Sequence, residues 1–454
     1  MQRFSATYVT GSHNFKTGFQ LQQGVLRQHT MVNQDVRYTF TRGAPTSLDQ
    51  LATPYSFLAN TGAELGVFAQ DQWKLQRLTV SLGLRFDYFN GYVPAQEIAA
   101  TRFLPARSFG EVRDVPNWKD LSPRVGGAYD LFGDGRTAVK VSIGRYVGKM
   151  STAVATANNP INTSINLVTR TWGDSDRDYV PDCDLQNFNV NGECGPINNF
   201  NFGLQNPNAV RYADDLIRGW GTRDYLWDFT TEVQHQLTPR ISIKAGWNRN
   251  WTNQFGDLFT NPGVNLANGG WPTGVTDNLA VTPADFQTYC ITAPSHAELP
   301  GGGYQICGLY DVVPSKFGQG SQDVTRASNF GDGKSRVSNF FSGSVSTRLG
   351  GRRELGASID TGRIVEDNCF VADSPQQLLF CHVVAPFSSQ TQVKAYWSLP
   401  LPAAFVVSGV VQNLAGTQRL ATYQAPNSLI APSLGRNLAA CGARTDCTSP
   451  RPCR

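Results

Sequence analysis

Residues 77–89, RLTVSLGLRFDYF, alternate between apolar and polar side chains over their whole length. Large apolar residues occupy every second position, and smaller or charged residues, including Arg85 and Asp87, lie between them. A period of two residues predicts a β-strand with one apolar and one polar face. At about 3.3 Å per residue the stretch would span roughly 40 Å, whereas an ordinary strand has about five or six residues. Its length is therefore the first feature to explain.

The same pattern recurs along the chain in pairs of segments separated by short turns rich in Gly, Pro and polar residues, which is typical of β-hairpins. The predicted strands are Phe4–Thr10, Phe15–Leu26, Glu64–Trp73, Leu78–Tyr88, Ser122–Leu131, Thr137–Tyr146, Tyr225–Leu237, Ile241–Trp251, Phe340–Leu349, Leu355–Arg363, Gln392–Ser398 and Phe405–Asn413. The sequence thus predicts six hairpins and about twelve strands.

The connections between the hairpins are long, and they alternate strictly with the short turns. They cover about residues 27–63, 89–121, 147–224, 252–339 and 364–391. In an antiparallel meander, all short turns then fall at one end and all long loops at the other. Compact soluble domains rarely carry loops of this length, whereas transmembrane barrels combine short periplasmic turns with long extracellular loops. We therefore expect an all-β, antiparallel up-and-down transmembrane barrel portion over residues 1–415, in which the apolar face of 78–88 meets lipid.

Composition narrows the classes of function. The chain has 454 residues, of which 16 % are charged, and its net charge is +4. Basic residues form no run, so we expect no nucleic-acid partner. No stretch of 18 apolar residues occurs, which excludes a transmembrane helix in the sequence but not strands that cross a membrane. The first residues resemble a strand already under way and not a signal peptide, so we do not expect residue 1 to be the natural start.

Aromatic residues cluster near the predicted strand ends, where membrane barrels carry girdles of aromatic side chains. They are Tyr88, Phe89, Tyr92, Trp220, Tyr225, Trp227, Trp247, Trp251, Tyr396 and Trp397. The same residues could instead fill the core of a soluble β-sandwich. The alternation of short turns and long loops favours the girdle.

The nine cysteines all lie outside the predicted strands. Pairs that share one loop or the tail predict local disulfides, formed in an oxidising compartment. These pairs are Cys183–Cys194, Cys290–Cys307, Cys369–Cys381 and Cys441–Cys447. Zinc binding is the alternative, but the chain has no CxxC pair and only five histidines. Cys453 is left over in the loop-like tail, 416–454.

The segment GDSDRDYVPDCDL, residues 173–185, is unusually acidic. Oxygen ligands at alternating positions of a loop can surround a hard cation, as calcium loops do. The candidate ligands are Asp174, Asp176, Asp178, Asp182 and Asp184, with Glu193 as a distal candidate. The alternative is a solvated acidic turn, and the spacing does not match an EF-hand. A structural Ca²⁺ is the only cofactor that the sequence suggests.

Motifs for catalysis are absent from the sequence. It contains no G-x-S-x-G, no H-E-x-x-H, no phosphate-binding loop and no G-x-G-x-x-G after a strand. We therefore expect a protein that is not an enzyme.

Several stretches resemble the barrel of TonB-dependent outer-membrane receptors, most closely the Oar-like group. They are FAQDQWKLQRLTVSLGLRFDYFNGYVP (68–94), WKDLSPRVGGAYDLFGDGRTAVKVSIGRYV (118–147), VQHQLTPRISIKAGWNRN (233–250) and YCITAPSHAELPGGGYQICGLYDV (289–312). The resemblance implies a barrel of about twenty-two strands around an N-terminal plug, energised through TonB. This sequence departs from the pattern, because it lacks a plug, a TonB box and the C-terminal strands. We therefore expect a partial chain, and no cargo-binding residue can be carried over.

Three functions are consistent with these observations. The first is an outer-membrane receptor that binds a bulky nutrient with its extracellular loops and passes it through a TonB-gated lumen. Its partners would be outer-membrane lipid, an unknown extracellular cargo and, through a plug absent from this chain, the TonB complex. The second is a barrel that anchors a surface for adhesion. The third is a secreted enzyme on a soluble β-scaffold, which requires the apolar strand faces to pack inward.

Overall fold

A computed structural model describes residues 1–149, 151–253, 275–297, 301–331, 335–350, 353–379, 381–416, 423–444 and 447–448. Within these residues, twelve long strands form one antiparallel sheet whose spatial order follows the chain. They are β1 (Gln2–Thr10), β2 (His13–Thr30), β5 (Tyr55–Leu75), β6 (Leu78–Tyr92), β9 (Asn117–Asp130), β10 (Thr137–Val147), β15 (Tyr225–Thr238), β16 (Ile241–Asn253), β21 (Ser335–Leu349), β22 (Arg353–Asp367), β24 (Gln392–Pro400) and β25 (Val406–Asn413). The prediction of an up-and-down all-β fold is confirmed.

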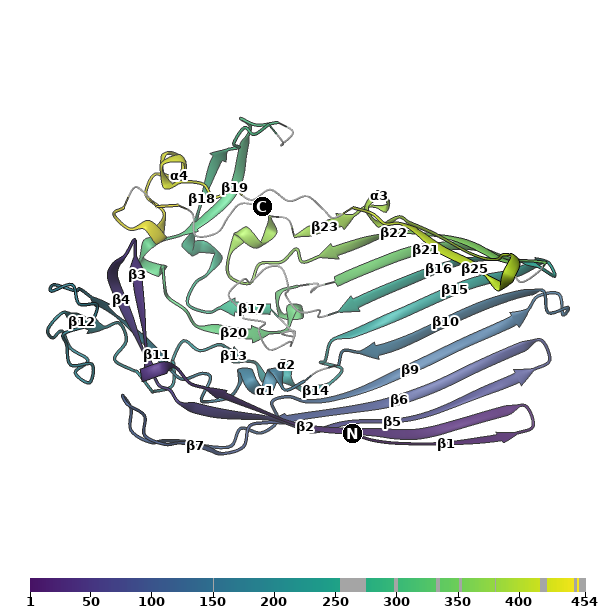
Figure 1. The fold of residues 1–454 in the computed structure, drawn as a ribbon, viewed down its shortest axis with the longest axis horizontal. Helices are drawn as coiled ribbons and strands as arrows, with labels where there is room; N and C mark the ends of the chain where they lie inside the picture. The colour runs from purple at the N-terminus through teal and green to yellow at the C-terminus, as the bar shows by residue number, and fades with distance from the viewer. Residues whose placement is uncertain are drawn as a thin grey trace.

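The two ends of the sheet are built differently, as Figure 1 shows. At the turn end, short connections such as residues 11–12, 76–77 and 239–240 join neighbouring strands. Asp130 closes one of them, because its carboxylate accepts hydrogen bonds from the backbone N–H groups of Gly133 and Gly135. The described segments between one hairpin and the next lie at the opposite, loop end.

The strands extend further toward the loop end than predicted, so the loops are shorter. β5 begins at Tyr55, nine residues before the predicted Glu64, and pairs with β2 up to Thr30. Residues 57–61 are mostly buried on both faces, since loop residues such as Asn159 bind over them. Burial on both sides removes the period-two pattern on which the prediction depended.

The long strands have two chemically distinct faces. The outer face carries the apolar residues of the alternating pattern; Leu82 and Leu84, for example, are 50 % and 51 % exposed. Phe86 pairs with Leu121 and Leu82 with Val125 on this face. The inner face carries the polar set, including Arg85, Asp87 and, on β10, Ser142. The apolar side chains therefore do not pack inward, as a soluble scaffold would require.

Segments at the loop end form a layer of smaller sheets and short helices. β14 (Arg218–Trp220) pairs with β9 and β23 (His382–Ala385) with β22 of the large sheet, whereas the smaller sheets of this layer contain β3 (Val36–Thr41), β4 (Ala44–Leu51), β7 (Gln96–Ile98), β8 (Arg107–Phe109), β11 (Leu167–Trp172), β12 (Cys194–Ile197), β13 (Arg211–Tyr212), β17 (Val275–Asn278), β18 (Phe286–Thr292), β19 (Gln305–Val312) and β20 (Gln322–Thr325). Its α-helices are α1 (Ala153–Ala157), α2 (Asp214–Ile217), α3 (Phe387–Gln390) and α4 (Asn427–Leu434). Short 3₁₀ turns cover Asn33–Asp35, Pro283–Asp285, Pro314–Lys316, Ala327–Phe330, Pro375–Leu378, Pro402–Ala404 and Ala439–Cys441, of which Pro402–Ala404 lies at the turn end.

Loops distant in sequence join in this layer. β11 pairs with β4, so the loop after β10 shares a four-stranded sheet with the loop after β2. The tail after β25 also packs here, because α4 contacts the β18–β19 hairpin through Ile430, Ile291 and Leu309. Arg436 of the tail binds Asp311 at the end of this hairpin, with Nη1 2.5 Å from Oδ2. The described part of the tail is thus folded onto the loop layer.

Among the described residues, no helix is long and apolar enough to cross a membrane.

Candidate functional site

A cluster of largely buried ionic side chains lies among the strands near the loop end of the sheet. It comprises Glu64, Arg85, Asp87, Asp120, Arg145 and Arg223, here called the inner ion cluster. Arg145 Nη2 lies 2.8 Å from Asp120 Oδ1, and the two side chains are only 9 % and 0 % exposed. Arg85 Nε lies 2.7 Å from Asp87 Oδ1. The cluster is too deeply buried to be a solvated surface network.

The cluster places two carboxylates of like charge opposite each other. Asp87 on β6 and Asp120 on β9 are direct cross-strand partners, an arrangement that destabilises a sheet unless cations compensate it. Arg85 and Arg145 each bind one of the two carboxylates. Gly66 leaves the room that this needs, since a Cβ there would overlap the Arg85 guanidinium.

The segment around β14 is held against the sheet beside the inner ion cluster. β14 pairs in parallel with the start of β9, and the indole Nε1 of Trp118 donates to the carbonyl of Leu216, 2.9 Å away. Arg223 follows β14; its Nη2 is 3.9 Å from Glu64, and its guanidinium lies 5.3 Å from the centre of the Phe89 ring. Phe89 is 1 % exposed, so its prediction as a girdle residue is wrong. It belongs to the inner face, as Asp87 does.

The acidic loop brings three carboxylates together. Asp174, Asp176 and Glu193 each offer an oxygen, and these oxygens lie within 4.8 Å of one another. Carboxylate oxygens are the ligands that a hard cation such as Ca²⁺ prefers. The donor set therefore fits such an ion, with the distal candidate Glu193 in it.

The other three predicted ligands lie elsewhere in the same loop. Asp178 donates its backbone N–H to Asp174 Oδ1 at 3.1 Å, and its own carboxylate accepts from Val180. The carbonyl of Asp182 accepts from the backbone of Glu193. The carboxylate of Asp184 accepts from Gln186. These carboxylates are not part of the three-residue group among the described residues.

The two sides of this group differ in their electrostatics. Partial desolvation, together with the nearby carboxylates of Asp178, Asp182 and Glu193, raises the pKa of Asp176. Hydrogen bonds from the backbone N–H groups of Ser175 and Asp182 lower the pKa of Glu193. Crowded carboxylates repel each other when all are ionised, and a bound cation would relieve that repulsion.

Arg170 organises the loop that carries these carboxylates. Its side chain is buried, and its guanidinium donates to the carbonyls of Gly195, Asn187 and Asn189 at 2.7, 3.1 and 2.9 Å. Burial lowers the pKa of Arg170. This role of Arg170 could not be predicted from the sequence, because hydrogen bonds to three backbone carbonyls leave no pattern of residue types.

Four disulfides link the cysteine pairs in the described part of the loop layer. They are Cys183–Cys194, Cys290–Cys307, Cys369–Cys381 and Cys441–Cys447, with Cα–Cα distances from 4.1 to 5.9 Å. Cys183 and Cys194 pack with Leu48 and Trp172 in a small apolar cluster. Cys453 lies outside the described residues.

Non-reducing peptide mapping of the purified protein is expected to recover the peptides of 183 and 194 joined to each other, and those of 290 and 307 likewise. Each pair is separated by fewer than twenty residues and held in contact by folded loops. Recovery of these four cysteines as free thiols would contradict the pairing.

The sheet and its two faces can be compared with a known protein family. Residues 3–294 match the outer membrane beta barrel domain family. The chain belongs to this outer-membrane barrel family. The assignment places it in the outer membrane, so the apolar outer face of its strands meets lipid and the inner face is the polar interior.

Solved structures that the barrel resembles are distant in sequence. The outer membrane transporter YddB of Escherichia coli is 9 % identical, with 87 % of this chain and 38 % of that chain covered and a TM-score of 0.40. The copper transporter OprC is 11 % identical; the match covers 92 % of this chain and 43 % of that chain, with a TM-score of 0.40. The FrpB iron transporter of Neisseria meningitidis is 8 % identical; the match covers 86 % of this chain and 41 % of that chain, with a TM-score of 0.34. This chain thus spans about two fifths of their lengths. A comparison with curated proteins finds no match.

Proposed function

We propose that this chain is the barrel portion of an outer-membrane receptor, which binds a bulky nutrient with its loops and passes it through a TonB-gated lumen. The observation that carries the proposal is the asymmetry of the sheet. One end has short turns, and the other bears a folded, disulfide-braced layer. A layer of this kind offers a preorganised binding surface, which lowers the entropic cost of capturing a ligand.

The mechanism is binding and gated passage, with no bond chemistry. The proposal requires a plug that contacts TonB and further strands that pair with the edges at β1 and β25. Unpaired strand edges cost several kcal/mol per backbone group in lipid, which supports further strands at both edges. The resemblance to the Oar-like receptors supports the same assignment.

Sequencing the locus on both sides of this reading frame tests the receptor proposal. We expect in-frame sequence for a plug and a TonB box before residue 1, and for further strands after residue 454. Intact flanks that encode none of these would contradict an energised receptor.

We further propose that Asp174, Asp176 and Glu193 hold a structural Ca²⁺ that stiffens the acidic loop. Replacing Asp176 by asparagine is expected to abolish calcium-dependent protection of residues 173–194 from protease, because it removes a charged ligand. The matched control is Asp184→Asn, in the same loop but outside the three-carboxylate group; it should keep the protection. Equal cleavage of the unaltered protein with calcium and with a chelator would rule out the site.

Adhesion is the second candidate, favoured by large apolar residues exposed on the loop layer. Tyr179, Val190 and Phe200 are among them. Exposed apolar surface of this kind marks contact with macromolecules more often than with small polar solutes. Replacing these three residues by serine would separate the two functions: lost attachment with intact uptake favours adhesion, and lost uptake favours the receptor.

A further inference from the structure

Arg249 and Arg363 lie on the lipid-facing side of the sheet, at positions where the strand pattern mostly places apolar residues. Arg249 on β16 pairs with Asn339 on β21, and Asn339 pairs with Arg363 on β22. Direct cross-strand partners share a face, so all three belong to the outer face that Phe229, the partner of Arg249 on β15, also occupies. Both arginine side chains are exposed.

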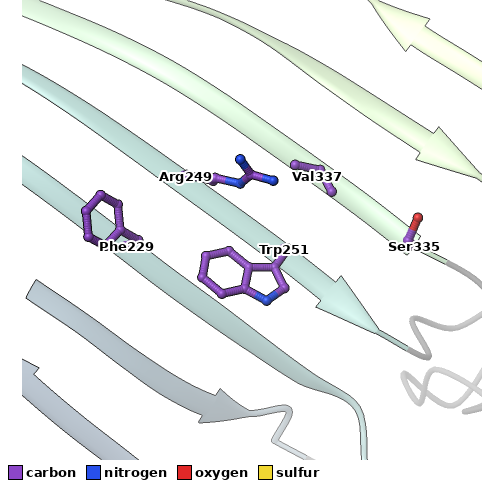
Figure 2. A pocket seen from close by; sticks show the side chains of 5 residues that line it. All are labelled: Phe229, Arg249, Trp251, Ser335 and Val337. Carbon is purple, nitrogen blue, oxygen red and sulfur yellow. The ribbon is translucent and has the colours of Figure 1, made fainter.

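Arg249 lies in a shallow depression between aromatic and aliphatic side chains, shown in Figure 2. The depression is lined by Phe229, Trp251, Val337 and Ser335 as well as by Arg249 itself. The Arg249 guanidinium carbon lies 6.0 Å from the centre of the Trp251 ring. Trp251 in turn stacks on Trp227, with ring centres 6.2 Å apart. This aromatic environment is that of a membrane interface.

The position of Arg249 along β16 is consistent with the membrane–water interface. Ile241 is the first residue of β16 and lies at the turn end, and Arg249 lies eight residues further along the strand. At about 3.4 Å per residue and a tilt of about 40°, this places it roughly 20 Å above the turn end, near the far border of an apolar band about 25 Å tall. An arginine is costly at the midplane but nearly neutral at such a border.

Neither guanidinium has an anionic partner within the protein, as far as the described residues show. The two acidic groups on β22 beyond Arg363 are both paired, Glu366 with Arg336 and Asp367 with His382. Two cations at a lipid interface, held about two strands or roughly 10 Å apart, thus remain available to an external anion.

We propose that Arg249 and Arg363 bind the phosphate groups of an anionic lipid in the outer leaflet. The guanidinium fork matches phosphate oxygens in geometry, and the apolar walls of the depression suit an acyl chain or the base of a headgroup. Free phosphate shares the charge but not the apolar part, so the depression points to a lipid. The site lies on the outside of the barrel, away from the inner ion cluster and the acidic loop.

The test uses the full chain in non-ionic detergent micelles, titrated with diphosphorylated lipid A and followed by native mass spectrometry. The double variant R249Q/R363Q is expected to bind about thirtyfold more weakly, about fivefold for each charge lost at a membrane surface. The control is Lys244→Gln on the inner face of β16; it should bind as the unaltered protein does.

Two measurements on the unaltered protein keep the proposal falsifiable if a variant folds poorly. Dephosphorylated lipid A should bind at least tenfold more weakly, and excess inorganic phosphate should not displace the phosphorylated lipid. Equal binding of both lipids would overturn the proposal, as would displacement by inorganic phosphate alone. An equal loss in the double variant and in Lys244→Gln would likewise overturn it.

Discussion

Replacing Asp120 by alanine is expected to lower the free energy of unfolding by about 3–5 kcal/mol, because it leaves the buried Arg145 cation without its anionic partner. Arg145 is 9 % exposed, and its Nη2 lies 2.8 Å from the carboxylate that would be removed. Its other contacts are the carbonyl of Leu121, 3.1 Å away, and the ring of Tyr225. Neither supplies a compensating negative charge. Unfolding in urea of the protein folded in detergent micelles measures the loss.

The matched control for Asp120→Ala is the exposed pair Arg348–Glu354, whose side chains are 85 % and 49 % exposed. Replacing Glu354 by alanine is expected to cost less than about 1 kcal/mol, because water screens such pairs. Equal effects of the two substitutions would mean that the inner ion cluster is accessible to water and contributes little to holding the β14 segment in place.

Replacing Val141 by arginine is expected to destabilise the barrel by about 2–4 kcal/mol, because the side chain faces lipid near the middle of the bilayer. Val141 is exposed and pairs with Gly127 and Thr231. It lies four residues from Thr137, the first residue of β10, or roughly 10 Å above the turn end along the membrane normal. Reversible unfolding from lipid vesicles gives the difference.

The neighbouring residue on the same strand provides the control. Ser142 faces the interior and pairs with Gly126, which leaves room for a longer side chain. Arginine there should cost less than about 1 kcal/mol, since the interior of such a barrel is polar. A larger cost at Ser142 than at Val141 would reverse the assignment of the two faces.

The strands could be predicted from the sequence because their signal is local. In 77–89 each side chain meets either lipid or a polar interior, and this contrast repeats at every second residue. The signal failed where strands pass under the loop layer. Phe57 and Asn60 of β5 are both buried although they lie at positions of opposite parity, so no alternation remains to be recognised.

The loop layer and the candidate sites were predictable only in part. Cysteines that share a loop suggested local pairs, and the aspartates of 174–178 indicated a cluster. Glu193 reaches that cluster through the fold of the loop around Arg170, which depends on backbone carbonyls. The partnership of Asp120 with Arg145 also depends on tertiary structure, because 25 residues separate them and β14 intrudes beside β9.

Epitope tags on intact cells test the central claim most directly. One tag is inserted after Val190 in the loop layer and another after Asp134 in the turn between β9 and β10. If the strands cross the outer membrane with the disulfide-braced layer outside, an antibody should label the first tag on intact cells. It should label the second only after the membrane is opened. Labelling of the Asp134 tag on intact cells, or equal labelling of both, would contradict this arrangement.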